Sequence, residues 1–194
     1  MWVRLLRSMH RGWGRSCTLA RLLIPAVLGL RVARGVMVGK AIEWPLANLR
    51  NVHIDENVSL GKRGWFHIPL DNRTARICIG AGSAIGDDFV ITSNASITVG
   101  RDCLLSYRVT LMDHAHVTGD GVAPVNSGLT SGRPIAIGDR CFIGCNVVVM
   151  PGVTLGANCV VGANSVVTHS FDDDAVLAGS PARLLRSLRP AAGR

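Results

Sequence analysis

The sequence predicts an all-β protein whose main part, residues 51–180, is a parallel β-helix. The first observation is a six-residue step in the second half of the chain. Counting every sixth residue from Ile137 gives only aliphatic residues: Ile137, Ile143, Val149, Leu155, Val161 and Val167. Gly directly follows four of these six. An α-helix turns about 100° per residue, so this step would scatter the aliphatic side chains around its surface. A chain that turns a corner every six residues instead keeps them all inside.

Glycine is the second observation. A Gly directly after the inward residue tolerates the backbone geometry of a corner, and a continuous strand would be weakened by it. Three corners close one coil of about 18 residues. Cys141 and Cys159 are 18 residues apart, so we expect them to stack in adjacent coils. Coils then pair as parallel strands about 4.8 Å apart.

The third observation is a break in the step. Upstream, Ile79, Ile85 and Ile91 keep it, but Leu111 and Ile137 are 26 residues apart, which is not a multiple of six. This predicts a protruding loop at residues 118–134, rich in Gly, Ser, Asn and Pro. Long ordered loops in compact repeat domains are often functional.

The two ends differ from the repeats. We expect residues 1–50, basic and apolar, to form a helical or extended segment that caps the first coil. Its clean apolar run, Leu22 to Leu30, is too short to span a bilayer, and no cleavage signature indicates a signal peptide. A helix lying on the membrane surface is the alternative. Residues 181–194 are predicted to form a short C-terminal helix and a tail.

Composition narrows the function classes. The formal net charge is +8, with arginines gathered at both ends, but no nucleic-acid motif accompanies them, so nucleic acid is not expected as a partner. Six Cys occur without CxxC pairs, and no nearby His completes a zinc set around Cys141 and Cys145. We expect reduced thiols in a cytoplasmic protein, with possible peripheral contact at the inner face of a bacterial cell membrane.

From Ile77 to Leu188 the chain resembles a known family. The stretch PIAIGDRCFIGCNVVVMPGVTLGANCVVGANSVVTHS, followed by LAGSPARLLRSL, is similar to hexapeptide-repeat acyltransferases, including sugar and polysaccharide O-acetyltransferases and the maltose, galactoside and virginiamycin-type acetyltransferases. The resemblance implies a left-handed β-helix, a homotrimer, and acetyl-CoA bound between neighbouring prisms. Because a thioester is already activated, no metal is expected to be required.

The candidate catalytic residues lie in the segment LMDHAHV, just before the predicted loop. Histidine, with an ordinary pKa near 6.5, suits base catalysis at neutral pH. The resemblance assigns the general base to the second histidine, His116. We expect Asp113 or a backbone carbonyl to orient an imidazole, and His114 to bind the acceptor or to serve a neighbouring subunit's site.

The resemblance also implies a coenzyme A site. Cys145 and Ala163 match family positions beside the pantetheine. Thr168 and His169 match a Thr-Lys pair near the nucleotide end of coenzyme A. Arg183 and Arg186 match basic residues near its phosphates. His169 in place of Lys, and Phe142 in place of a frequent Trp, depart from the family pattern.

These residues predict an acetyl-CoA-dependent O-acetyltransferase acting on a sugar hydroxyl, of a cell-surface polysaccharide or its precursor, by direct attack on the thioester. A xenobiotic or amino-sugar N-acetyltransferase is the alternative within the class. Two alternatives lie outside the acyltransferase class. One is a zinc enzyme like the γ-class carbonic anhydrases, whose wider His spacing is absent here, and the other is a non-catalytic scaffold. The acceptor, the position acetylated and the length of the acyl group stay open at this level.

Overall fold

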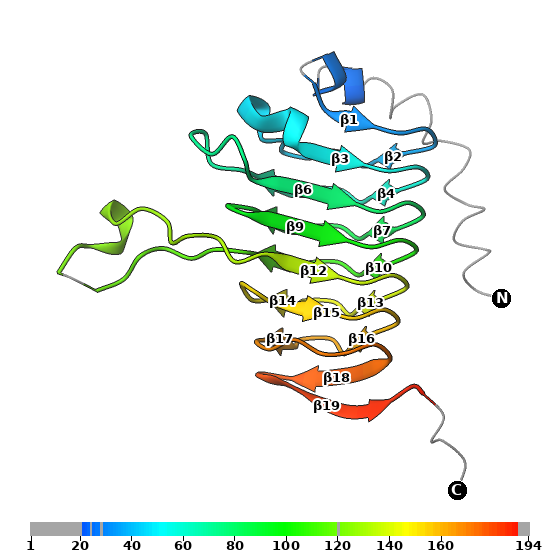
Figure 1. Ribbon diagram of the computed structural model, residues 1–194. Coiled ribbons are helices and arrows are strands. Elements are labelled where there is room, and N and C mark those ends of the chain that lie inside the picture. The colour runs from blue at the N-terminus through cyan, green and yellow to red at the C-terminus, as the bar shows by residue number, and fades with distance from the viewer. Residues whose placement is uncertain (1–20, 24, 28, 120, 190–194) are drawn as a thin grey trace, which may run out of the picture.

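A computed structural model describes residues 21–189, except residues 24, 28 and 120. The chain winds into a three-sided prism of stacked coils, with one long arm leaving it sideways (Figure 1). Each coil contributes a short strand to each side, so the sides are parallel sheets, here named A, B and C. The predicted parallel β-helix is confirmed.

The strands are short because a corner follows each of them. Sheet A contains β1 (Arg31–Val32), β3 (Val52–Ile54), β6 (Arg76–Ile79), β9 (Ser96–Val99), β12 (Ile135–Ile137) and β15 (Thr154–Leu155). Sheet B contains β2 (Met37–Val38), β4 (Ser59–Leu60), β7 (Ala84–Ile85), β10 (Leu104–Leu105), β13 (Phe142–Ile143), β16 (Val160–Val161), β18 (Ala175–Gly179) and β19 (Ala182–Ser187). Sheet C contains β5 (Trp65–His67), β8 (Val90–Thr92), β11 (Thr110–Met112), β14 (Val148–Val149) and β17 (Val166–Val167). There are also two 3-10 helices, η1 (Leu46–Asn51) and η2 (Pro124–Asn126), and residues 21–23 and 25–27, within the expected N-terminal segment, are helical.

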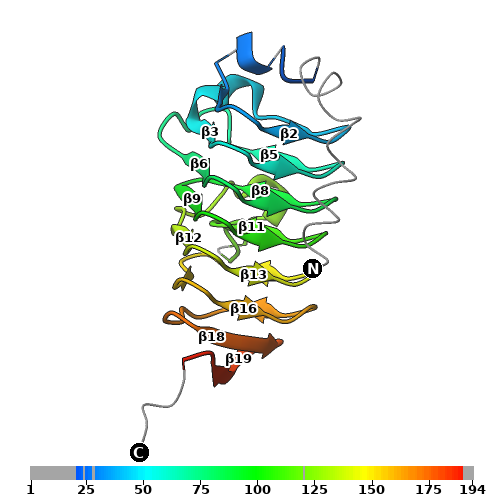
Figure 2. The ribbon, with the colours of Figure 1, turned by 90° about the vertical axis from the view of Figure 1, so that its right-hand side faces the viewer.

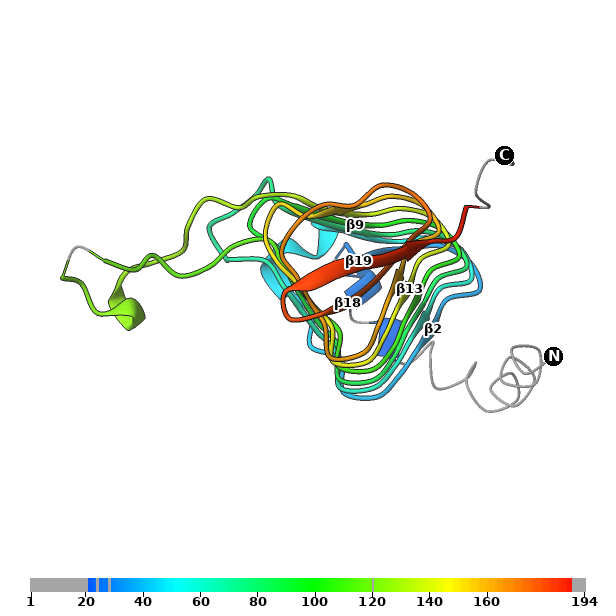
Figure 3. The same ribbon diagram turned by 90° about the horizontal axis from the view of Figure 1, so that it is seen from below.

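The handedness follows from the order of the sheets. Seen from the C-terminal end, the chain passes clockwise from β9 on sheet A to sheet B, where β13 lies, while it advances toward the viewer (Figure 3). A clockwise path toward the viewer is a left-handed coil, as the resemblance implied. The same stacking is visible from the side, where β5, β8 and β11 lie one below another (Figure 2).

The six-residue step fills the interior. All six of its aliphatic side chains between Ile137 and Val167 are at most 2% exposed. Cys141 and Cys159 are buried in adjacent coils, as expected, and Cys103 continues their ladder on the other side of Cys141. Each buried aliphatic side chain contributes about 1.5–3 kcal/mol of burial free energy. Because each coil covers the next, these contributions are cooperative.

The corners use glycine differently from the prediction. The corner residues with positive φ are mostly not Gly: Asn, Asp, Arg and one Ala take this conformation, among them Asn158 and Asn164, both at φ 59°. The glycines of the step allow close stacking instead. A Cβ added at Gly138 would lie 2.6 Å from the backbone of Gly156 and Ala157 in the next coil. Glycine is needed at these positions because the backbone of the next coil leaves no space for a side chain.

Only one of the three corners varies in length. Between sheets A and B (corner AB) and between B and C (corner BC), successive inward residues stay six apart, as in Ile79, Ile85 and Ile91. Stacked inward residues of neighbouring coils, however, are 25, 20, 38 and 18 residues apart, as Ile54, Ile79, Val99, Ile137 and Leu155 show. Every additional residue therefore lies between sheets C and A, at corner CA.

The longest insertion, residues 113–134, is the arm. Its two limbs run antiparallel, with a bridge between His116 and Leu129 and a hydrogen bond from the Thr130 N–H to the Ala115 carbonyl of 2.7 Å. The arm extends far from the prism in two views (Figures 1 and 3). Its tip carries η2, where Val125 is 87% exposed. The predicted loop 118–134 is thus the outer part of a longer excursion that begins at Asp113.

Both ends correct the expected boundaries. The first coil begins at Arg31, because β1 pairs in parallel with β3, so residues 31–50 belong to the β-helix itself. The predicted C-terminal helix is wrong. After Gly179 the chain reverses, and β19 pairs antiparallel with β18. Without it the edge of β18 would have no strand partner, and ladder pairing there outweighs the helical preference of the ARLLRS segment. Residues 1–20 and 190–194 of the predicted ends lie outside the described residues.

Candidate active site at corner CA

Corner CA carries a chain of polar contacts from one coil to the next. The side-chain amide of Asn48 donates to the Pro69 carbonyl at 2.8 Å, and that of Asn72 to the Asn94 carbonyl at 2.7 Å. The Asn94 N–H then donates to Asp113 Oδ1, also at 2.7 Å. The insertions are therefore built on one another, and the chain of contacts ends at the base of the arm.

Asp113 is the centre of this corner. Its carboxylate is fully buried and accepts hydrogen bonds from the Ser93 hydroxyl at 2.8 Å, the Ala95 N–H at 2.9 Å and the Asn94 N–H. A fourth contact joins Asp113 Oδ1 to Nδ1 of His114 at 2.9 Å. A buried carboxylate with this many donors is fixed in position.

His114 is held in one tautomer by this contact. Because a carboxylate only accepts, Nδ1 of His114 carries the hydrogen, and Nε2 keeps its lone pair when the ring is neutral. The side chain is 6% exposed. In the described part of the chain, no buried side-chain nitrogen or oxygen lacks a partner, and Nε2 makes no hydrogen bond there. Nε2 is therefore the ring atom that solvent or a ligand reaches.

His67 adds a third ionisable group near this corner. It is the last residue of β5, and it aligns with Thr92 and Met112 at the ends of β8 and β11. Its ring lies 5.3 Å from that of Trp65, centroid to centroid. Burial, and secondly the charge of His114, lower the pKa of His67 below its usual value near 6.5. The neutral form of His67 is thus favoured.

His116, the predicted general base, lies at the root of the arm. Its side chain is exposed and makes no hydrogen bond with another described residue. One residue, Ala115, separates it from His114, but of these two histidines only His114 contacts Asp113. The structure thus brings Asp113 and His114 together and leaves His116 apart from that pair.

The predicted coenzyme A residues lie in three places. Cys145 and Ala163 lie at corner BC in adjacent coils, where the Asn164 N–H donates to the Cys145 carbonyl at 2.9 Å. Arg183 and Arg186 are exposed on β19 in sheet B. Thr168 and His169 lie at corner CA, with Oγ1 of Thr168 2.8 Å from Nδ1 of His169. Cys145 and Ala163 are therefore separated from Asp113 and His114 by the width of sheet C.

Sequence reasoning missed several residues of this site: His67, Asn72, Ser93 and Asn94. A signal was present, since the coil lengths between Ile54 and Leu155 change only between sheets C and A. Aligning the coils on their inward residues would have placed Asn72, Ser93 and Asn94 at the same corner as Asp113. For His67 no such signal exists, because it occupies a regular strand position.

A family model described as the hexapeptide repeat of succinyl-transferase matches residues 134–169. These are the coils in which the six-residue step is unbroken. The chain belongs to the hexapeptide-repeat family. In a solved structure, the hexapeptide-repeat acetyltransferase VCA0836 from Vibrio cholerae O1 biovar eltor is complexed with acetyl coenzyme A. It is 26% identical, with a TM-score of 0.62, and the superposition covers 96% of this chain and 85% of VCA0836.

Two curated relatives of this hexapeptide-repeat protein come from Escherichia coli strain K12. WbbJ, named for O-acetyl transfer in lipopolysaccharide biosynthesis, is 38% identical over 109 residues, 52% of this chain and 55% of WbbJ. Galactoside O-acetyltransferase is 31% identical over 131 residues, 67% of this chain and 64% of the relative. The chain thus spans between a half and two thirds of the length of these relatives.

Within the described residues, no group of three or more His, Cys, Asp or Glu side chains is arranged to hold a metal ion. None of the helices there has the length and apolar character needed to cross a lipid bilayer.

Proposed function

We propose that this protein transfers an acetyl group from acetyl-CoA to a sugar hydroxyl, of a cell-surface polysaccharide or its precursor, with His114 as general base. The observation that carries the proposal is the Asp113–His114 pair, which lies where the repeat is interrupted and leaves Nε2 accessible. The names of the relatives support the acetyl group and the hydroxyl acceptor, because WbbJ and the galactoside enzyme are both named as O-acetyltransferases. The complex of VCA0836 with acetyl coenzyme A supports the choice of donor.

The proposed chemistry is a single displacement through a tetrahedral intermediate. Nε2 of His114 takes the proton of the acceptor hydroxyl as its oxygen attacks the thioester carbonyl. The carbon–sulfur bond then breaks, and the imidazolium returns the proton to the leaving thiolate of coenzyme A. Asp113 keeps the ring in the required tautomer and stabilises the transient imidazolium, as a buried carboxylate beside histidine does.

The assignment of the base to His116 remains a prediction from the resemblance. The contacts of the structure favour His114, because an oriented imidazole needs a partner for its second nitrogen and only His114 has one. His116, exposed at the start of the arm, is instead placed to contact the acceptor.

A homotrimer would complete the site. In one chain, Cys145 and Ala163 lie at corner BC and His114 at corner CA, so a donor held along corner BC is displaced from the base. Packing of corner BC of one copy against corner CA of the next would bring acetyl-CoA and His114 together. Mixing a His114→Ala variant with an Ala163→Trp variant should then restore activity that neither has alone. No recovery in verified mixed oligomers would contradict a shared site.

The localisation also remains a proposal: a cytoplasmic protein with peripheral contact at the inner membrane face through its basic N-terminal segment. Deletion of residues 1–20 followed by cell fractionation tests this contact. Unchanged membrane recovery would exclude that segment as the anchor.

The acceptor and the donor are tested together by incubating the protein with acetyl-CoA and a panel of sugars, nucleotide sugars and oligosaccharides. We expect release of free coenzyme A that depends on a sugar, and an acetylated product whose ester is cleaved by hydroxylamine. An acetyl product resistant to hydroxylamine would indicate transfer to nitrogen. No sugar-dependent release across the panel would contradict the proposal.

A further inference from the structure

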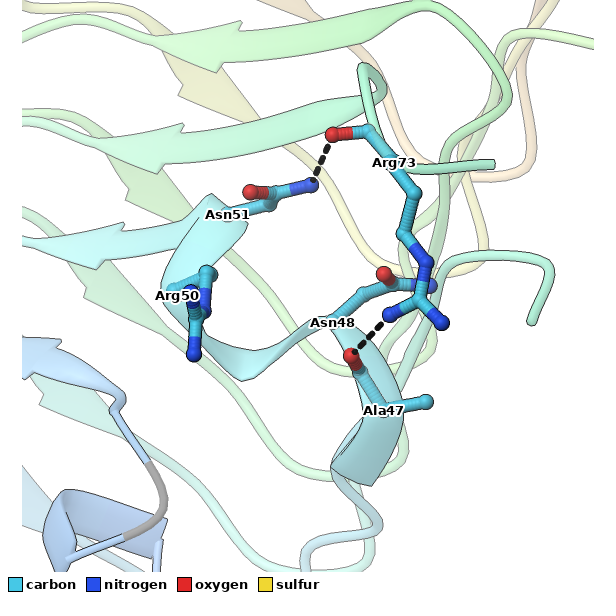
Figure 4. A pocket seen from close by; sticks show the side chains of 5 residues that line it. All are labelled: Ala47, Asn48, Arg50, Asn51 and Arg73. Carbon is cyan, nitrogen blue, oxygen red and sulfur yellow. Dashed lines mark hydrogen bonds between the residues drawn. The ribbon is translucent and has the colours of Figure 1, made fainter. Parts of the chain in front are cut away.

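A cavity lies at the N-terminal end of corner CA. It has a volume of about 310 Å³ and is lined by residues of η1 and of the 69–75 insertion (Figure 4). The lining residues are Ala47, Asn48, Arg50, Asn51 and Arg73. Two of the five are arginines, and no carboxylate is among them.

The positive charge of this cavity is not neutralised. Neither Arg50 nor Arg73 forms an ion pair with a carboxylate in the described part of the chain. One terminal nitrogen of Arg73 donates to the Ala47 carbonyl at 3.1 Å, which orients the guanidinium across the cavity and leaves its other donors available (Figure 4). A planar guanidinium presents paired donors that match phosphate oxygens.

The turn that carries Arg73 is held rigidly. Oδ1 of Asn72 accepts from the N–H groups of Thr74 and Ala75, and its amide donates to Asn94. The Asn51 side chain donates to the Arg73 carbonyl at 3.0 Å, which ties the turn to η1. Since the turn is already ordered, an anion bound there would cost little conformational entropy.

The position of the cavity relates it to His114. The 69–75 insertion and the arm leave the same corner two coils apart, and coils are about 4.8 Å apart, so the separation along the axis is roughly 10 Å. Asn72 and Asn94 connect the two places through the contacts that end at Asp113. A sugar whose hydroxyl faces His114 can therefore extend a phosphate group along the corner toward Arg73.

We infer that the cavity binds the diphosphate of an activated acceptor, so that the substrate is a diphosphate-linked sugar and not a free one. The inference rests on the proposed function, because it places the sugar at His114. Nucleotide-linked and lipid-linked sugars share this diphosphate. The separation between Arg73 and His114 along corner CA sets the distance between the bound diphosphate and the reacting hydroxyl. Arg73 supplies paired donors and Arg50 a second positive charge.

The test is calorimetric binding to the intact protein, without turnover, of inorganic pyrophosphate, uridine diphosphate and farnesyl diphosphate. Arg73→Gln should weaken pyrophosphate binding about tenfold or more, because it removes charge-assisted hydrogen bonds. Arg73→Lys should weaken it less, since the charge remains and the fork is lost. Arg50→Gln, whose side chain makes no hydrogen bond in the described residues, is the second variant. Arg101→Gln, an exposed arginine at corner AB, is the matched control and should leave binding unchanged.

Tighter binding of uridine diphosphate would identify a nucleotide-linked acceptor, and tighter binding of farnesyl diphosphate a lipid-linked one. The inference is overturned if pyrophosphate does not bind, if Arg101→Gln weakens it as much as Arg73→Gln, or if saturating coenzyme A displaces it. Pyrophosphate binding without acetyl transfer would contradict the proposed function alone. Transfer to a free sugar, with no pyrophosphate binding, would contradict this inference alone.

Discussion

Corners AB and BC repeat with little change along the prism, whereas corner CA differs in every coil between Ile54 and Leu155. Within the described residues, the two regular corners contain all eleven non-glycine residues with positive φ. They are defined by backbone conformation and by close stacking. Corner CA is defined by side chains instead: amides, a buried carboxylate and a histidine. One corner has been free to vary in length because the other two keep the coils in register.

The largest effect that separates the corners should come from insertions. Two Gly residues inserted after Arg140, at corner AB, would displace β13 from its register with β10 and β16. We expect the free energy of unfolding to fall by on the order of 3 kcal/mol or more, because ladder hydrogen bonds on both sides are lost. The same insertion after Gly121, in the arm, should cost about 0.6 kcal/mol or less. Urea unfolding measures both, and equal losses would mean that the corners do not differ in tolerance.

How much of this the sequence could reveal depends on the corner. The inward residues from Ile137 to Val167 were predictable because burial fixes aliphatic side chains at a constant step. The conformational role of Asn158 and Asn164 was not, because an asparagine beside a buried cysteine or serine looks like an ordinary polar residue until its φ is known. The strand β19 was missed because its pairing with β18 is a tertiary contact that helix propensity does not report.

For the site, the sequence located the segment and not the arrangement. Asp113, His114 and His116 were all identified, since the break in the step lies beside them. Which histidine meets the carboxylate depends on the direction of each side chain at the corner. That direction is set by Ser93, Asn94 and Ala95 one coil away, which fix Asp113. No spacing rule within residues 113–116 contains this information.

The second effect compares two aspartates. Asp113→Ala should lower the free energy of unfolding by about 3–5 kcal/mol, because it leaves the buried hydroxyl of Ser93 and the partly buried N–H groups of Asn94 and Ala95 without their carboxylate partner. Asp139→Ala is the counterpart at corner AB, where one carboxylate oxygen accepts from the Arg101 N–H at 2.8 Å. It should cost about 0.5–1.5 kcal/mol. Equal losses in chemical denaturation would contradict the central place of Asp113.

The smallest effect concerns pH. The pKa of His67 is lowered in the folded protein, by burial and then by the charge of His114, so the folded state binds fewer protons than the unfolded state. The stability that neutral His67 contributes is therefore complete above its ordinary pKa near 6.5 and is lost as the pH falls through the lowered value. Thermal unfolding of His67→Gln should depend less on pH between about pH 7.5 and 5 than that of the parent protein. An unchanged dependence would exclude His67 as its source.

The most direct test of the account is the turnover number of two variants two residues apart. His114→Ala should lower kcat for acetyl transfer by about 10²–10⁴-fold while calorimetry shows unchanged acetyl-CoA binding, because it removes the imidazole that Asp113 orients. His116→Ala should retain most of kcat and change mainly KM for the acceptor. A His114→Ala variant with near-normal kcat, beside an inactive His116→Ala variant, would contradict the account and assign the base to the root of the arm.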